Sequence, residues 1–197
     1  YGYSDAYDGA GNRLPSFALS EFRRDDQRWG AYDYLVVMVG SAWCPPCSAR
    51  LRSFDQSASL FAAHRVLFNY VMLENSDYEP GTAGSAYLEV SDHVSDLDIV
   101  STGEGNRTHT RDWSDRFVGD EQFSIPSLVV IRRSDGVIVS DDLNPLEPEE
   151  LVRILERAPY IDLDEQASEE PESLYESQIC AGAAEQGPEL LDEQHPV

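Results

Sequence analysis

Short apolar runs alternate with stretches of helical periodicity along most of the chain. Two of these runs, Tyr34–Val39 and Val66–Leu73, are rich in Val and lack polar alternation, which predicts strands buried on both faces. Between them a helix is predicted from about Cys47 to His64-Arg65, because its apolar residues recur at helical spacing. These apolar residues are Leu51, Phe54, Ala58 and Phe61.

The later part of the chain predicts a β-hairpin followed by a helix. Leu128–Ile131 and Val137–Val139 are apolar runs on either side of Asp135-Gly136, a pair that favours a tight turn between antiparallel strands. Glu149–Ala158 has one apolar face and acids in its first turn, which predicts a helix. Near the N-terminus, Ser16–Arg24 predicts a short helix or a turn.

The pattern is weakest between the second strand and the hairpin. Asn75 to about Gly105 predicts a helix or an irregular excursion, and Thr110–Val118 predicts a short helix. After Tyr160 acids and small polar residues replace the apolar pattern, which predicts a mobile tail. We therefore expect three parts: an N-terminal extension over 1–15, an α/β domain over 16–160 and an acidic tail over 161–197.

The net charge of −23 narrows the range of partners. All 14 basic residues are Arg, against 37 acids, 11 of which fall in residues 160–197. An acidic surface disfavours nucleic acids and anionic membranes, since both attract basic proteins. Solubility or a saline habitat explains the charge more simply than a partner that binds the acidic surface does. No run approaches the roughly 20 apolar residues of a membrane helix, so an anchor is expected only upstream of Tyr1.

The candidate chemistry lies in Trp43-Cys44-Pro45-Pro46-Cys47, directly after the first strand and at the start of the helix. Pro45 and Pro46 fit the first helical turn, where backbone N–H groups have no intrahelical partner. Cys44 then lies at the helix N-terminus, where these N–H groups and the helix dipole favour a thiolate. Cys47, three residues on, can face the same way. Such a pair of thiols predicts a thiol–disulfide exchange site.

Two other interpretations of the cysteines are weaker. A purely structural disulfide across four residues would gain little, because the entropic benefit of a cross-link grows with loop length. A zinc site would need a second pair of ligands, and neither Cys180 nor the four histidines has the required spacing. We therefore expect no metal, and no cofactor other than the redox-active Cys44–Cys47 disulfide itself.

The order of these elements, together with Trp-Cys-Pro-Pro-Cys and Ile125-Pro126, resembles the thioredoxin-like family. The resemblance covers about residues 15–160 and is closest to the extracytoplasmic thiol–disulfide oxidoreductases, whose opening turn and Leu-Ser-x-Phe-Arg segment are similar to Asp8–Asn12 and Leu19–Arg23. It implies a thioredoxin-like three-layer α/β/α sandwich with a central mixed sheet. The excursion is then an insertion before the helix and strand unit that carries a cis-proline.

The resemblance also implies roles for the matching residues. Cys44 would be the attacking thiol and Cys47 the resolving thiol. Trp43 would shape the substrate surface, the alternative being ordinary packing at a strand end. Pro126 would be the cis-proline beside the disulfide and would turn the backbone of Ile125 toward the substrate. The alternative for Pro126 is a trans proline that opens an edge strand.

Two acids typical of such proteins are missing from this chain. Thioredoxins carry a buried Asp six residues before the first cysteine, where Met38 stands here. The cytochrome-maturation branch carries a Glu six residues after that cysteine, where Arg50 stands here. Glu74, at the end of the second strand, is a candidate replacement. Arg50 is either a solvated helix residue or a cation that favours the nearby thiolates.

The predicted function is disulfide exchange with protein substrates, as a reductase rather than an oxidase, with an upstream redox partner. The alternative is a binding or chaperone module with the same fold and little redox turnover, which the acidic surface and the missing acids favour. A peroxidase is disfavoured because its Pro-x-x-x-Thr pattern is absent. We expect a monomer in the periplasm or elsewhere outside the cytoplasm. Cys180 is expected to be a free thiol, or else a partner for intermolecular exchange.

Overall fold

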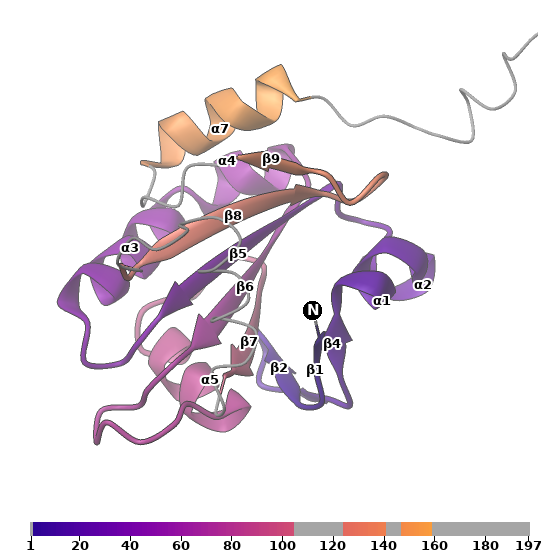
Figure 1. The fold of residues 1–197 in the computed structure, drawn as a ribbon. Helices are drawn as coiled ribbons and strands as arrows, with labels where there is room; N and C mark the ends of the chain where they lie inside the picture. The colour runs from indigo at the N-terminus through magenta and orange to yellow at the C-terminus, as the bar shows by residue number, and fades with distance from the viewer. Residues whose placement is uncertain (1, 105–123, 141–146, 159–197) are drawn as a thin grey trace, which may run out of the picture. The chain divides into compact units, whose positions relative to one another are not determined.

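The computed structural model describes residues 2–104, 124–140 and 147–158 (Figure 1). The predicted helix at Thr110–Val118, the predicted tail after Tyr160 and Cys180 lie outside the described residues. Within the described part, no helix has the length and apolar character needed to cross a membrane.

A mixed sheet of seven strands forms the centre of the described domain (Figure 1). Its order is β3-β2-β7-β6-β5-β8-β9. β5, β6 and β7 run parallel, whereas β8 pairs antiparallel with β5 on the other side. The strand bounds are β2 Ala6–Asp8, β3 Arg13–Leu14, β5 Tyr34–Gly40, β6 Val66–Met72, β7 Ile99–Gly103, β8 Ser127–Arg132 and β9 Ile138–Ser140. A separate pair joins β1 Gly2–Tyr3 to β4 Phe17–Ala18.

Helices cover both faces of this sheet because alternate residues of the buried strands point to opposite sides. Along β5, Val36 and Met38 belong to one apolar cluster, and Val37 and Val39 to the other. The first cluster includes residues of α3 Pro45–Gln56, α4 Ala58–Ala63, α5 Ala83–Ser91 and α7 Pro148–Arg157. The second includes residues of α1 Leu19–Arg24 and α2 Asp26–Trp29. The predicted three-layer α/β/α sandwich is therefore confirmed.

The two predicted strands, the hairpin and the last helix are confirmed as β5, β6, β8–β9 and α7. The long helix predicted from Cys47 to Arg65 is wrong in one respect, because it breaks at Ser57 into α3 and α4. Ser57 has φ −108° and ψ 15°, outside the helical range. Phe54, Ala58 and Phe61 on the two sides of this break all reach the first cluster. Serine favours helix ends over helix interiors, and this position follows that preference.

The excursion over Asn75–Gly105 contains α5 and also β7, a central strand that the sequence pattern does not predict. β7 has only two apolar residues before Ser101 and Thr102, which are nevertheless buried. Asn69 on β6 donates from Nδ2 to the hydroxyl of Thr102 and to the carbonyl of Val100, at 3.0 Å each. These hydrogen bonds allow a polar segment to occupy the interior of the sheet.

Residues 6–14, which lie in the segment expected to precede the domain, form one edge of its sheet. β2 pairs antiparallel with β7, and β3 pairs with β2 around the predicted turn. In this turn the carboxylate of Asp8 accepts the backbone N–H groups of Ala10 and Asn12, and Gly11 has φ +84°. Strands of two or three residues are too short to give a periodic signal, so the sequence shows only the turn.

Asp55, in the last turn of α3, anchors the segment between α5 and β7. Its carboxylate accepts the backbone N–H groups of Ser95, Asp96 and Leu97 at 2.8–3.0 Å and the hydroxyl of Ser95. Burial alone would raise the pKa of Asp55, but these hydrogen bonds outweigh it and lower the pKa below its ordinary value of 3.8. Asp55 therefore stabilises the fold fully above about pH 4, and this stabilisation is lost as the pH falls through the lowered pKa.

We predict that Asp55→Ala lowers the free energy of unfolding by roughly 2 kcal/mol at pH 7, since four hydrogen bonds to a charged group are lost. The difference from wild type should shrink below about pH 4, because the carboxyl then becomes protonated, first in the unfolded chain and at lower pH in the folded protein. Urea unfolding at pH 7 and pH 3 measures both values. Gln56→Ala, an exposed neighbour in α3, is the control. An equal loss at both pH values would contradict the assigned role.

Candidate active site

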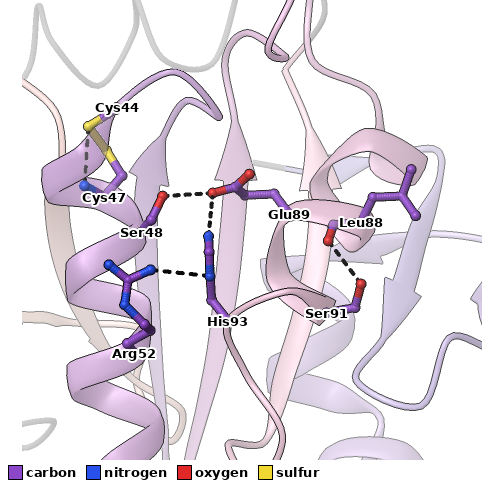
Figure 2. Close-up of polar contacts among 8 residues, drawn as sticks. All are labelled: Cys44, Cys47, Ser48, Arg52, Leu88, Glu89, Ser91 and His93. Carbon is purple, nitrogen blue, oxygen red and sulfur yellow. Dashed lines mark hydrogen bonds and ion pairs between the residues drawn. A yellow bond between two sulfur atoms is a disulfide. The ribbon is translucent and has the colours of Figure 1, made fainter.

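The two cysteines lie where the central strand ends and α3 begins. Cys44 is the N-cap of α3, and Pro45 and Pro46 are its first two residues, as the sequence predicts. Cys44 and Cys47 are joined by a disulfide. The backbone N–H of Cys47 points at the sulfur of Cys44, with an N···S distance of 3.2 Å (Figure 2). A helix N-terminal donor is thus directed at the atom that becomes a thiolate when the disulfide is reduced.

The disulfide is almost entirely enclosed. Cys44 is 3% exposed and Cys47 is fully buried, and both belong to the first apolar cluster together with Met38. Such surroundings disfavour a charged thiolate relative to the neutral disulfide. The helix N-terminus therefore stabilises the thiolate of the reduced pair, whereas the apolar enclosure destabilises it.

Ile125 and Pro126 lie beside Cys44 because β8 pairs with β5. The register Val39 to Ser127 brings the start of β8 alongside the end of β5. The peptide bond between Ile125 and Pro126 is cis, and Pro126 is buried. The carbonyl oxygen of Ile125 lies 4.0 Å from the sulfur of Cys44. This backbone is thus within reach of a chain that approaches the disulfide.

Trp43 forms an exposed aromatic surface next to the disulfide with Tyr78. The Trp43 side chain is 42% exposed, so it is not packed into the core at the strand end. Its indole N–H donates to the carboxylate of Glu74 at 2.9 Å, and its ring stacks on that of Tyr78 at 5.8 Å. Glu74, expected as a replacement acid, therefore positions Trp43. Tyr78 was not predicted, because it lies in a turn that Asn75 organises by accepting two backbone N–H groups.

Behind the disulfide, Gly40 allows Tyr70 and Cys47 to approach the last residue of β5. A methyl group at Gly40 would lie 2.9 Å from the hydroxyl oxygen of Tyr70 and 3.2 Å from the sulfur of Cys47. Tyr70 is completely buried, and its hydroxyl has no hydrogen-bond partner among the described residues. Burial raises the pKa of Tyr70 far above its ordinary value, and the charge of Glu89 raises it further. The phenol is therefore neutral at physiological pH.

A polar network links α3 to α5 one residue after Cys47 (Figure 2). The hydroxyl of Ser48 donates to Oε1 of Glu89 at 2.8 Å, and Nε2 of His93 lies 3.2 Å from the same oxygen. Nδ1 of His93 lies 3.3 Å from the guanidinium of Arg52. Because arginine can only donate, Nδ1 accepts and Nε2 carries the proton that faces Glu89. None of these contacts was predicted, since α5 lies within the excursion.

The contacts of Arg50 include an ion pair and a cation–π contact. Its guanidinium pairs with the carboxylate of Glu147 at 3.0 Å and lies over the ring of Phe54 at 5.7 Å. Glu147 is the N-cap of α7, so this pair joins the beginning of α7 to α3. Within the described ranges, no group of three or more His, Cys, Asp or Glu residues has the arrangement of a metal site.

The Redoxin family model matches residues 9–157 of this chain. No curated protein sequence matches it. Solved structures share its fold. Thioredoxin peroxidase I from Plasmodium yoelii is 12% identical with a TM-score of 0.57, and the match covers 95% of each chain. Reduced 2-Cys peroxiredoxin from Plasmodium vivax is 10% identical with a TM-score of 0.56, over 85% of this chain and 94% of that one. A putative thiol-disulfide oxidoreductase from Bacteroides vulgatus is 15% identical with a TM-score of 0.53, over 81% of this chain and 93% of that one.

We predict that Gly40→Ala destabilises the protein by roughly 1–3 kcal/mol, because the added methyl group overpacks the contact between Tyr70 and Cys47. Urea unfolding of the oxidised protein measures the loss. Gly84→Ala in α5 is the matched control, since the nearest atom to its methyl group would lie 3.9 Å away. That control should be neutral or slightly stabilising, by up to about 1 kcal/mol, through helix propensity. Equal effects of the two substitutions would rule out the contact at Gly40.

Proposed function

The chain belongs to the Redoxin family and is an oxidoreductase of thioredoxin-like fold, and we propose that it reduces disulfides in protein substrates through Cys44 and Cys47. One observation carries this proposal: the Cys44–Cys47 disulfide lies at the N-terminus of α3, with the backbone N–H of Cys47 directed at the sulfur of Cys44. A thiol in that position is the better nucleophile of the two and starts the exchange.

The exchange takes two steps and transfers two electrons. The Cys44 thiolate attacks one sulfur of the substrate disulfide, forms a mixed disulfide and releases the other substrate sulfur as a thiolate. The Cys47 thiol then loses its proton and attacks the sulfur of Cys44. The Cys44–Cys47 disulfide forms, and the second substrate sulfur leaves as a thiolate that takes up a proton. Both substrate sulfurs are reduced, and a separate dithiol partner must reduce Cys44 and Cys47 again.

The apolar enclosure of Cys44 and Cys47 supports reduction, rather than oxidation, of the substrate. Because both cysteines lie in an apolar cluster, the reduced form gains less from thiolate solvation than an exposed pair does. This favours the disulfide form of the enzyme, and therefore reduction of the substrate. The N–H donor directed at Cys44 stabilises its thiolate and so favours the reduced enzyme. We propose that the apolar enclosure has the larger effect.

Substrate recognition is proposed to use Trp43, Tyr78 and the backbone of Ile125. Trp43 and Tyr78 offer a stacked aromatic surface, and large aromatic side chains contribute strongly to peptide contacts. The carbonyl of Ile125, 4.0 Å from the Cys44 sulfur, is suited to pair with an extended peptide. A substrate cysteine held by this pairing would lie against Cys44.

The functional unit is proposed to be a monomeric domain that includes residues 1–15, because β2 and β3 belong to its sheet. A location outside the cytoplasm is supported by the similarity of the active-site motif and the opening turn to extracytoplasmic oxidoreductases. The proposed partners are protein thiols and disulfides and an upstream electron donor. A peroxidase is less well supported, because the Pro-x-x-x-Thr pattern of such enzymes does not precede Cys44.

We predict that Cys44→Ser abolishes the acceleration of insulin reduction by dithiothreitol, whereas Cys47→Ser accumulates mixed disulfides with the substrate. Both substitutions are made together with Cys180→Ser, so that no cysteine outside the active site remains. Turbidity measures insulin reduction, and mass spectrometry of acid-quenched samples identifies the mixed disulfide. If the protein with intact Cys44 and Cys47 is no faster than Cys44→Ser, it is a binding module with little redox turnover.

The reduction potential of the Cys44–Cys47 pair, measured at equilibrium with glutathione, tests whether the protein reduces or oxidises its substrates. A reductase should have a reduction potential near about −270 mV, whereas an oxidase or isomerase should have one of about −120 to −180 mV. Titration of the Cys180→Ser protein in glutathione buffers, followed by its tryptophan fluorescence, gives this value. A potential in the higher range would overturn the proposed direction and leave the exchange chemistry intact.

A further inference from the structure

The exchange described above requires an acceptor for the proton of Cys47. The Cys47 sulfur is fully buried, so bulk water does not reach it directly. A thiol attacks a disulfide only as the thiolate, and therefore the proton must leave through groups that line the interior. The structure has two unusual polar groups on that side of the disulfide, the hydroxyl of Tyr70 and the carboxylate of Glu89.

The hydroxyl of Tyr70 borders the Cys47 sulfur at the end of β5. Both atoms flank the space that Gly40 leaves empty, at 2.9 Å and 3.2 Å from the position of a methyl group there. A buried hydroxyl without a hydrogen-bond partner costs free energy, and the part of the chain that the structure describes offers it none. In the disulfide state the Cys47 sulfur is a weak acceptor, whereas in the reduced state it is a thiol or a thiolate. Tyr70 thus gains a partner when the disulfide opens.

Glu89 supplies a carboxylate behind this phenol. Its side chain is only 14% exposed, and Ser48 and His93 both hold its Oε1 (Figure 2). Ser48, which donates to this carboxylate, directly follows Cys47 in α3. Ala86 and Val90, on either side of Glu89 along α5, pack in the same apolar cluster as Cys47 and Tyr70. The carboxylate is therefore set into the wall of this cluster.

We propose that Tyr70 and Glu89 form a proton relay for Cys47. This inference rests on the proposed function. It assigns a proton-transferring role to Tyr70, whose hydroxyl flanks the same space at Gly40 as the reacting sulfur, and a proton-accepting role to Glu89. Ser48 and His93 act as positioning residues for the carboxylate.

The relay is balanced in protons and electrons. When Cys47 attacks the mixed disulfide, its S–H proton passes to the hydroxyl oxygen of Tyr70, and the hydroxyl proton of Tyr70 passes to Glu89. The sulfur of Cys47 forms the bond to Cys44, and the electron pair of the broken bond leaves with the substrate sulfur. Tyr70 remains a neutral phenol before and after the step, in agreement with its raised pKa. Glu89 then releases the proton to solvent, which its exposed fraction permits.

Other carboxylates of the described residues are less suited to this role. Glu74 accepts the indole N–H of Trp43, and Glu147 pairs with Arg50. Glu104 is buried, but it accepts the hydroxyl of Tyr3, a residue that packs against the second apolar cluster. That cluster lies on the opposite face of the sheet from the cysteines, so Glu104 is separated from Cys47 by the strands.

The test is the rate at which the mixed disulfide closes in the full chain carrying Cys180→Ser. Reduced protein is mixed with glutathione disulfide, quenched with acid at set times and analysed by mass spectrometry, which separates the glutathione adduct from the closed disulfide. We expect Tyr70→Phe and Glu89→Gln each to slow closure about tenfold or more at pH 7, within the range of general acid–base catalysis. The rate of attack by Cys44 should stay within about twofold, because the relay does not contact Cys44.

Tyr34→Phe and Asp92→Asn are the matched controls. Tyr34→Phe removes another buried phenol hydroxyl, which donates to the carbonyl of Ala158 at the other end of β5. Asp92→Asn removes an exposed negative charge at the end of the same helix as Glu89. Both controls should close at the wild-type rate. Tyr70→Phe keeps the shape of the ring, so it tests the relay even if Glu89→Gln fails to fold.

The pH profile of closure separates a relay from a structural effect. A relay variant should differ from wild type most near neutral pH and approach it above about pH 9, where the thiol ionises without the help of the relay. A packing defect would slow closure equally at all pH values. Among the described residues, the titratable and charged groups around Cys47 include Cys44 at the N-cap of α3, Arg50 and Arg52 on α3, Tyr70 on β6, Glu89 on α5, His93 just after α5, and Glu147 before α7.

The outcomes distinguish this inference from the function on which it rests. If the wild type never closes its mixed disulfide, the proposed function fails. If the wild type closes and both relay variants match it, the relay is wrong and the exchange function stands. Slowing in only one of the two variants, or slowing that is independent of pH, would also overturn the relay.

Discussion

The close approach of β5 to the first turn of α3 determines the geometry of the whole site. β5 is buried between β6 and β8 over its full length, and its last residue is Gly40. Four residues later Cys44 caps α3. Because Gly40 has no side chain, Tyr70 and the Cys47 sulfur can both pack against this end of the strand. A larger residue would separate α3 from β6 and displace the disulfide from the polar groups behind it.

Much of the fold and the reactive pair could be predicted from local pattern alone. Continuous apolar runs identify β5 and β6, and the two prolines after Cys44 fix the start of α3, because both signals are contained within a few residues. β7 and α5 could not be predicted in this way. β7 is stabilised by the side chain of Asn69 on another strand, and such long-range hydrogen bonds leave no periodic trace in the sequence.

The surroundings of the site are mostly contributed by the segment that the sequence describes least well. The excursion after β6 provides Tyr78, which stacks on Trp43, and Glu89, which faces Ser48 beside Cys47. It then returns as β7 to complete the parallel part of the sheet. Glu74 shows that a position in the sequence does not give the contacts of a side chain. Its place at the end of β6 suggests nearness to the cysteines, but its carboxylate is engaged with the indole of Trp43.

An acidic protein with an apolar redox centre must separate its charges from its sulfurs. Met38 packs in the same apolar cluster as the cysteines. Glu74, Glu89 and Glu147 lie outside β5, and each has a donor partner. A carboxylate on the strand beneath Cys47 would face the sulfur directly and oppose its thiolate by charge repulsion. In the proposed relay, the neutral phenol of Tyr70 passes the proton to a carboxylate on α5, so that no charged group has to lie against the sulfur. The separation of Glu89 from Cys47 is therefore consistent with both requirements of the resolving thiol, an exit for its proton and an apolar environment for its attack.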